Sequence, residues 1–162
     1  MKNVTKNVYN MVETERNIVR TFVKGDDFMD RNVTKEFEKW LKSTRKTALF
    51  VDGARQIGKT YSLREFGRAH YTHFAELNFL EDPAAKAIFD GNLDADTLVT
   101  NLTAYLRTPL EPGNTVVFFD EIQECPNART AIKFLVEDGR FDYMESGSLL
   151  GVNYKHVPSM PV

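Results

Sequence analysis

Short apolar runs recur along the chain and predict buried β-strands. They occupy residues 47–52, 73–80, 115–120 and 141–146. The third run begins with TVVFF and is apolar almost throughout, as expected of a strand that is buried on both faces of a parallel sheet. The pattern therefore predicts four strands of one sheet.

Helical periodicity lies before and between these runs. Val33, Phe37, Trp40 and Leu41 fall at i, i+4, i+7 and i+8, which places them on one face of a helix. Strands that alternate with helices indicate a parallel sheet covered by helices on both faces. We therefore expect a three-layer α/β fold, with further helices at about 59–68, 83–89, 96–106 and 126–138.

The first 28 residues are harder to interpret. Apolar residues between Val8 and Val23 are loosely spaced as in a helix, but the charged stretch 13–16 interrupts them. One interpretation is an accessory helix. The other, which we adopt, is an N-terminal extension at 1–28 that is not native to the fold, so that the domain occupies 29–162.

A glycine-rich sequence connects the first predicted strand to the helix that follows it. It matches the phosphate-binding pattern G-x-x-x-x-G-K-[ST]. The glycines permit a tight loop whose N–H groups point at a phosphate, the lysine reaches the β- and γ-phosphates, and the threonine hydroxyl binds Mg²⁺. We expect a nucleotide to be bound by Gly53, Ala54, Arg55, Gln56, Ile57, Gly58, Lys59 and Thr60.

Polar residues follow two other predicted strands. Asp120 and Glu121 end the third strand, and Ser146 ends the fourth. Because ligands of such sheets bind at the carboxyl ends of the strands, these residues are expected beside the phosphate loop. We expect Asp120 to hold Mg²⁺ with Thr60 and Glu121 to polarise the attacking water. The alternatives are that the two carboxylates cap a helix and that Ser146 belongs to a plain turn.

Composition narrows the class of protein. The chain has 162 residues with 42% hydrophobic and 27% charged residues, so one soluble globular domain is expected. With a net charge of -2, nothing global indicates nucleic acid as a partner. There is no apolar segment long enough for a membrane, no signal peptide and a single cysteine, Cys125, which together favour the cytoplasm. An Asn-Lys-x-Asp motif, which a GTPase would need, is missing.

Several motifs together resemble a known family. The phosphate-binding pattern, also called Walker A, lies within LFVDGARQIGKT at 49–60, and LNF stands at 77–79. The apolar strand that ends in Asp120 and Glu121 is a Walker B sequence and runs on into DEIQE at 120–124, and ESGSLL stands at 145–150. The sequence over about 29–160 is similar to the prokaryotic AAA-domain ATPases of family fourteen. This resemblance implies a P-loop ATPase fold, ATP and Mg²⁺ as cofactors, hydrolysis of ATP with Lys59 and Glu121 as catalytic residues, and Ser146 at the sensor position.

The chain departs from the family at its C-terminus. Members continue further, so we expect a partial domain that lacks the last core strand, the helical lid and the attached C-terminal domain. Strand 47–52 would then lie at an open apolar edge and favour self-association. The expected function is ATP hydrolysis that switches or drives an attached domain, and the alternative is a truncated nucleotide-binding fragment that does not hydrolyse ATP. Arg129 and Arg140 are interpreted either as an arginine finger for a neighbouring subunit or as ordinary surface residues.

Overall fold

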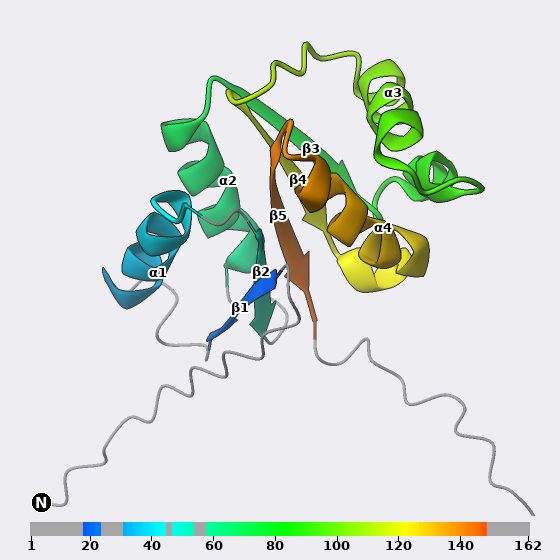
Figure 1. Ribbon diagram of the computed structural model, residues 1–162. Coiled ribbons are helices and arrows are strands. Elements are labelled where there is room, and N and C mark those ends of the chain that lie inside the picture. Colours follow the sequence, from blue (N-terminus) through cyan, green and yellow to red (C-terminus); the bar gives the residue numbers. More distant parts are fainter. Residues whose placement is uncertain (1–17, 24–30, 45–46, 54–57, 149–162) are drawn as a thin grey trace, which may run out of the picture.

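The computed structural model describes residues 18–23, 31–44, 47–53 and 58–148. They form one parallel sheet of five strands in the order β1-β2-β5-β4-β3 (Figure 1). The strands are β1 (Ile18–Val23), β2 (Ala48–Gly53), β3 (His73–Asn78), β4 (Thr115–Asp120) and β5 (Asp142–Gly147).

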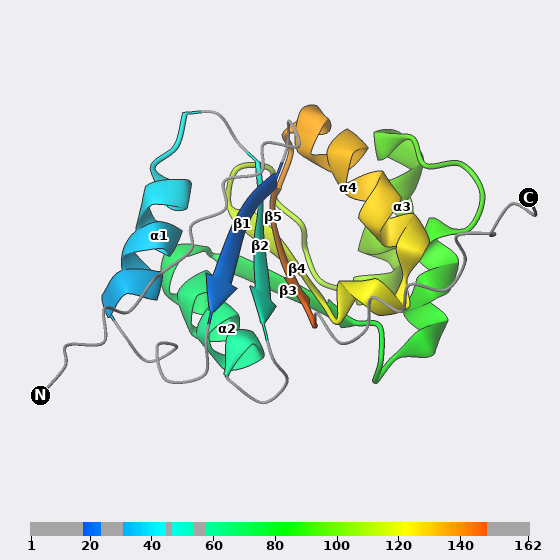
Figure 2. The same cartoon turned by 90° about the horizontal axis from the view of Figure 1, so that it is seen from below.

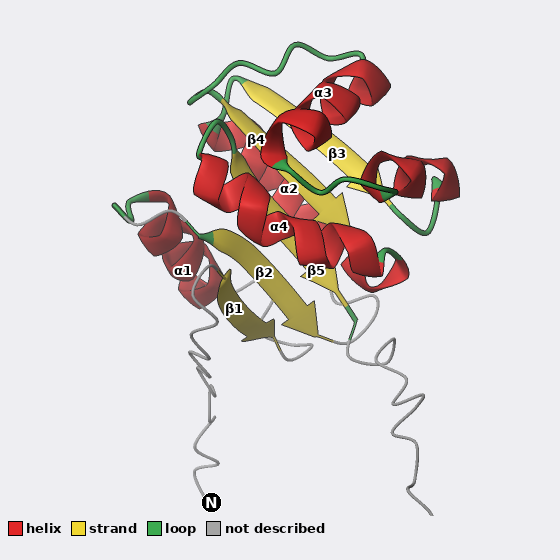
Figure 3. Ribbon diagram, turned by 45° about the vertical axis from the view of Figure 1, so that its right-hand side comes forward, coloured by secondary structure: helices red, strands yellow, loops and turns green. Residues whose placement is uncertain are grey.

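Helices cover both faces of the sheet (Figure 2). α1 and α2 pack on one face, while α3, α4 and a 3-10 helix, η1, pack on the other, where Figure 3 shows α3 and α4 in front of the sheet. The predicted three-layer α/β fold is therefore confirmed. The helical elements are α1 (Arg31–Leu41), α2 (Lys59–His70), η1 (Pro83–Phe89), α3 (Ala95–Leu106), η2 (Ile122–Glu124) and α4 (Pro126–Asp138).

The apolar face predicted for the first helix packs on the sheet. Val33, Phe37 and Trp40 are buried, and the ring of Phe37 packs edge-on against that of Phe66 in α2, with ring centroids 5.2 Å apart. The indole Nε1 of Trp40 donates a hydrogen bond to the carbonyl of Thr47 at 2.6 Å. This contact fixes the end of α1 beside the start of β2, the strand that leads into the glycine-rich loop.

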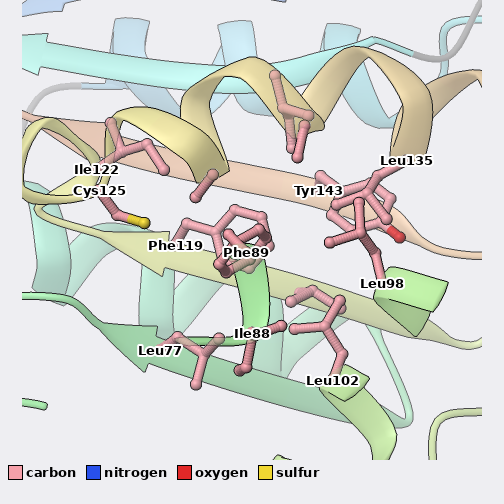
Figure 4. Packing of buried hydrophobic residues seen from close by; sticks show 14 of the residues in the cluster. Leu77, Ile88, Phe89, Leu98, Leu102, Phe119, Ile122, Cys125, Leu135 and Tyr143 are labelled. Carbon is pink, nitrogen blue, oxygen red and sulfur yellow. The ribbon is translucent and has the colours of Figure 1, made fainter. Parts of the chain in front are cut away.

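The opposite face holds the larger apolar cluster (Figure 4). Phe119 of β4 packs edge-on against Phe89 of η1, with ring centroids 5.5 Å apart, and Leu135 of α4 and Leu98 of α3 complete the layer. Each inner strand sends alternate side chains to the two clusters, as its apolar run predicts. The carboxyl ends of β2, β5 and β4 are thereby held side by side.

The sheet differs from the expected one at its β2 edge. β1 pairs in parallel with β2 from Ile18 opposite Ala48 to Val23 opposite Gly53. The expectation that strand 47–52 forms an open edge is therefore wrong, because residues 18–23 of the expected N-terminal extension cover it. The sequence IVRTFV places apolar residues at spacings that suit a helix and a strand equally, so its pattern alone does not indicate a strand.

Two smaller differences concern the connections. The short helix expected at 83–89 has those bounds but is a 3-10 helix, and the strand expected at 73–80 ends at Asn78. The side-chain Oδ1 of Asn78 accepts hydrogen bonds from the N–H groups of Leu80 and Glu81, both at 3.0 Å. This turn ends the strand, since those N–H groups are bonded to a side chain within the turn.

Candidate functional site

Three neighbouring strands bring the polar residues singled out in the sequence to one edge of the sheet. β2 ends at Gly53, β4 at Asp120 and β5 at Gly147, and β5 lies between the other two. All strands of the sheet are parallel, so these ends point the same way. Such an edge is where α/β sheets of this type bind ligands.

The two ends of the glycine-rich loop are described, whereas Ala54, Arg55, Gln56 and Ile57 lie outside the described residues. Gly58 has φ 90°, a left-handed conformation that favours glycine, and α2 begins at the next residue. The helix thus directs its N-terminal N–H groups and the positive end of its dipole toward the loop.

Lys59 is a buried cation, with 6% of its surface exposed. Its Nζ donates a hydrogen bond to the carbonyl of Gly53 at 3.0 Å. The N–H of the same glycine donates to Oδ1 of Asp52 at 2.7 Å. Asp52 and Lys59 therefore hold the peptide groups on either side of the Cα of Gly53, the first residue of the loop, and the sequence pattern did not reveal the part played by Asp52.

The carboxylate of Asp120 is the centre of the site. Oγ1 of Thr60 lies 3.0 and 3.2 Å from its two oxygens, although 60 residues separate the two in the chain. Ser146 of β5 donates a hydrogen bond from its hydroxyl to Oδ1, and Nδ2 of Asn78 donates one to Oδ2 at 3.0 Å. Three elements besides β4 thus orient one nearly buried carboxylate. Asn78 lies within a motif of the family resemblance, but no role was expected for it.

Glu121 directly follows this carboxylate in a left-handed conformation, with φ 54° and ψ 47°. A residue with a side chain adopts this conformation at a cost, and such residues cluster in functional sites. Its N–H donates a hydrogen bond to Oγ of Ser146 at 3.3 Å, and its Oε2 accepts one from Nε2 of Gln123. The hydroxyl of Ser146 therefore links Asp120 to the backbone of Glu121.

The donor atoms suit a magnesium ion. The Thr60 hydroxyl and the Asp120 carboxylate are hard oxygen ligands, and Mg²⁺ in nucleotide sites is bound by one or two such groups, by phosphate oxygens and by water. Within the described ranges, no three His, Cys, Asp or Glu side chains cluster as they do in an all-protein metal site. The residues thus fit an ion that is shared with a nucleotide.

Comparison with known proteins agrees with this arrangement. The model of the family described as an AAA domain, family fourteen, matches residues 45–162. The chain belongs to this family. This AAA domain is accordingly a nucleotide-binding domain of the P-loop ATPase-like class. Comparison with curated proteins gives no match, and neither does comparison with solved structures.

Among the described helices of the AAA domain, none is long and apolar enough to cross a membrane.

The two arginines considered as fingers form ion pairs within the AAA domain. Arg140 pairs with Asp138 and with Asp96 of α3, both at 2.7 Å. Arg129 of α4 pairs with Glu145 of β5. Both guanidinium groups are thus engaged by carboxylates of the same chain.

Proposed function

We propose that this AAA domain binds ATP with Mg²⁺ and hydrolyses it to ADP and phosphate. The observation that carries the proposal is the contact between Thr60 and Asp120 at 3.0 Å. It joins the end of the glycine-rich loop to the acidic end of a neighbouring strand, and phosphoryl-transfer sites of P-loop proteins are built from these two parts. Membership of the AAA domain family supports the nucleotide-binding half of the proposal.

Binding rests on the loop and on the start of α2. The N–H groups at the N-terminus of α2 and the ammonium of Lys59 supply positive charge for the phosphates. When nucleotide binds, the Nζ of Lys59 exchanges the Gly53 carbonyl for phosphate oxygens. The hydrogen bonds to phosphate are stronger because these oxygens are charged. Mg²⁺ held by Thr60 and Asp120 would neutralise charge on the β- and γ-phosphates.

Hydrolysis rests on Glu121. Its carboxylate accepts a hydrogen bond from the water that attacks the γ-phosphate and takes up the proton as the new P–O bond forms. Ser146 holds the backbone N–H of Glu121 and the carboxylate of Asp120 in one fixed arrangement. Positioning of this kind supplies most of the catalysis in phosphoryl transfer, since the protein has little covalent chemistry to perform. Turnover then switches or drives whatever is attached to the domain.

Titration with a fluorescent ATP analogue in the presence of Mg²⁺, followed by a phosphate-release assay, tests the proposal. We expect the wild type to bind and turn over, and Lys59→Ala to lose most of its affinity because a buried cation at the phosphates is removed. Lys133→Ala is the matched control, since it removes an exposed lysine of α4. Equal affinity of the wild type and Lys59→Ala would contradict the binding site, and binding without phosphate release would contradict the ATPase.

A further inference from the structure

Glu145 and Phe50 form a cross-strand pair just below the candidate site. They lie directly opposite each other in the pairing of β2 with β5. Phe50 stands three residues before Gly53, where the loop begins, and Glu145 stands one residue before Ser146. The pair therefore lies at the base of two of the three strand ends that the proposed ATPase uses.

Glu145 is a fully buried carboxylate. Its Oε2 is paired with Nη1 of Arg129, while its Oε1 is buried and makes no hydrogen bond within the described part of the chain. Burial raises the pKa of Glu145 to about 7, although the attraction of Arg129 opposes this shift. Arg129 is thus the group that limits this rise, so that Glu145 is mostly ionised only at a pH above about 7.

Arg129 contacts both strands at once. Its guanidinium carbon lies 4.4 Å from the centre of the Phe50 ring, in a cation–π contact with β2, while its ion pair reaches Glu145 on β5. Gly147 leaves the space that the ring occupies, because a Cβ at that position would come within 3.0 Å of two ring carbons of Phe50. One residue of α4 therefore contacts a side chain of each strand close to its end, in addition to the backbone pairing that joins β2 to β5.

Stability alone does not account for this arrangement. Removing a carboxylate from water is costly, and a pair of apolar side chains of similar size often gives equal or greater stability. The ion pair and the flat contact of a guanidinium on an aromatic ring instead depend on direction and distance, so they define one geometry. The end of β2 leads into the phosphate loop, and the end of β5 carries Ser146, which contacts Asp120 and the backbone of Glu121. Strand ends with these tasks require such definition.

We propose that Arg129 and Glu145 are positioning residues of the nucleotide site, which set the carboxyl ends of β2 and β5 for hydrolysis through Phe50. The inference rests on the proposed ATPase function. It assigns to Arg129 a role at the nucleotide site of its own chain, in place of a finger for the site of a neighbouring subunit. Phosphate binding depends on the loop and α2, whereas the ion pair and the ring contact join α4 to β5 and β2. The loss of the pair should therefore lower kcat and leave KM nearly unchanged.

The double variant Arg129→Met with Glu145→Gln tests this inference. It removes both charges together, so no unpaired buried charge remains and the fold should persist. At about pH 8, where Glu145 is ionised in the wild type, we expect kcat to fall about tenfold while KM changes less than about twofold. The melting temperature should stay within a few degrees of the wild type. Lys133→Met, which removes an exposed cation from the same helix, should behave as the wild type.

Arg129→Lys provides a second test that retains the charge. Lysine still neutralises Glu145 but has no flat group to lie on Phe50, so the chain should fold and kcat should still fall severalfold. If both variants fold and keep the wild-type kcat, the positioning role is wrong while the ATPase proposal stands. If the double variant unfolds, the kcat of Arg129→Lys decides. A wild-type chain that neither binds nor hydrolyses ATP would contradict the proposed function, and this inference with it.

Discussion

The side-chain amide of Gln123 joins Glu121 to the residue that follows β5. Its Nε2 donates a hydrogen bond to Oε2 of Glu121, and its Oε1 accepts one from the N–H of Ser148 at 3.3 Å. A flipped amide would point an oxygen at a carboxylate and an NH₂ group at an N–H, so one orientation alone satisfies both partners. Gln123 therefore fixes the direction of the Glu121 carboxylate.

Gln123→Ala should impair hydrolysis and leave ATP binding unchanged. The carboxylate of Glu121 loses its side-chain partner, while the loop and Lys59 remain as they were. We expect kcat to fall about tenfold, which is within the range for the loss of orientation at a general base. Steady-state phosphate release measures the effect, with the exposed Asn127→Ala as the control. An unchanged kcat would show that Glu121 needs no support from Gln123.

Ser146→Ala and Ser148→Ala should have opposite consequences. Ser146 donates to Asp120 and accepts from Glu121, so its loss should destabilise the fold by roughly 1–3 kcal/mol and raise the Mg²⁺ concentration needed for activity. The hydroxyl of Ser148 is buried without a hydrogen bond in the described structure, so its removal should be neutral or stabilising. Urea unfolding of the two variants and Mg²⁺ titrations of their activity measure the difference. Equal effects would contradict the assignment of Ser146.

A chain that begins at Met29 should be less stable than the full chain. It lacks β1, so β2 would expose an apolar edge that invites pairing with another copy. We expect a melting temperature lower by several degrees and a concentration-dependent increase in size by light scattering. A chain that lacks only residues 1–17 is the control, because it retains β1. Equal melting temperatures for the two shortened chains would show that β1 contributes nothing.

The ionisation of Glu145 predicts a pH dependence of stability. Its pKa in the fold, about 7, lies above the ordinary 4.5, so the folded state binds this proton more tightly than the unfolded state does. The resulting stabilisation is fully present below about pH 4.5 and is lost as the pH rises through about 7. As the pH rises over that range, the free energy of unfolding of the wild type should fall by on the order of 3 kcal/mol relative to that of Glu145→Gln. Urea unfolding at several pH values measures the difference, and a constant difference would contradict the shift.

Much of the fold could be predicted from local patterns. The inner strands are apolar runs and the helices have clean periodicity. Each of these elements can therefore be predicted from its own sequence, without knowledge of the others. The residues IVRTFV of β1 suit a helix as well as a strand, and only pairing with β2 decides between them. Edge strands commonly have this ambiguity, since they need less apolar sequence than central strands do.

The positions of the candidate site residues could be predicted where these residues lie in motifs. The glycines, Lys59 and Thr60 of the loop have characteristic spacing, and the acidic pair Asp120 and Glu121 stands at the end of an apolar strand. Asn78 and Gln123 act through hydrogen bonds to Asp120 and Ser148, which are 42 and 25 residues away in the chain, so no spacing reveals them. The burial of Glu145 could not be predicted either. A polar residue in a strand does not indicate that an arginine 16 positions earlier will pair with it.

Single-turnover hydrolysis by the wild type and Glu121→Gln tests the central claim most directly. Glutamine keeps the size of the side chain and removes the charge that polarises the attacking water. We predict that both proteins bind Mg·ATP with similar affinity, and that Glu121→Gln loses at least about 99% of the hydrolysis rate. A variant that hydrolyses bound ATP as fast as the wild type would contradict the assignment of Glu121 and the mechanism built on it.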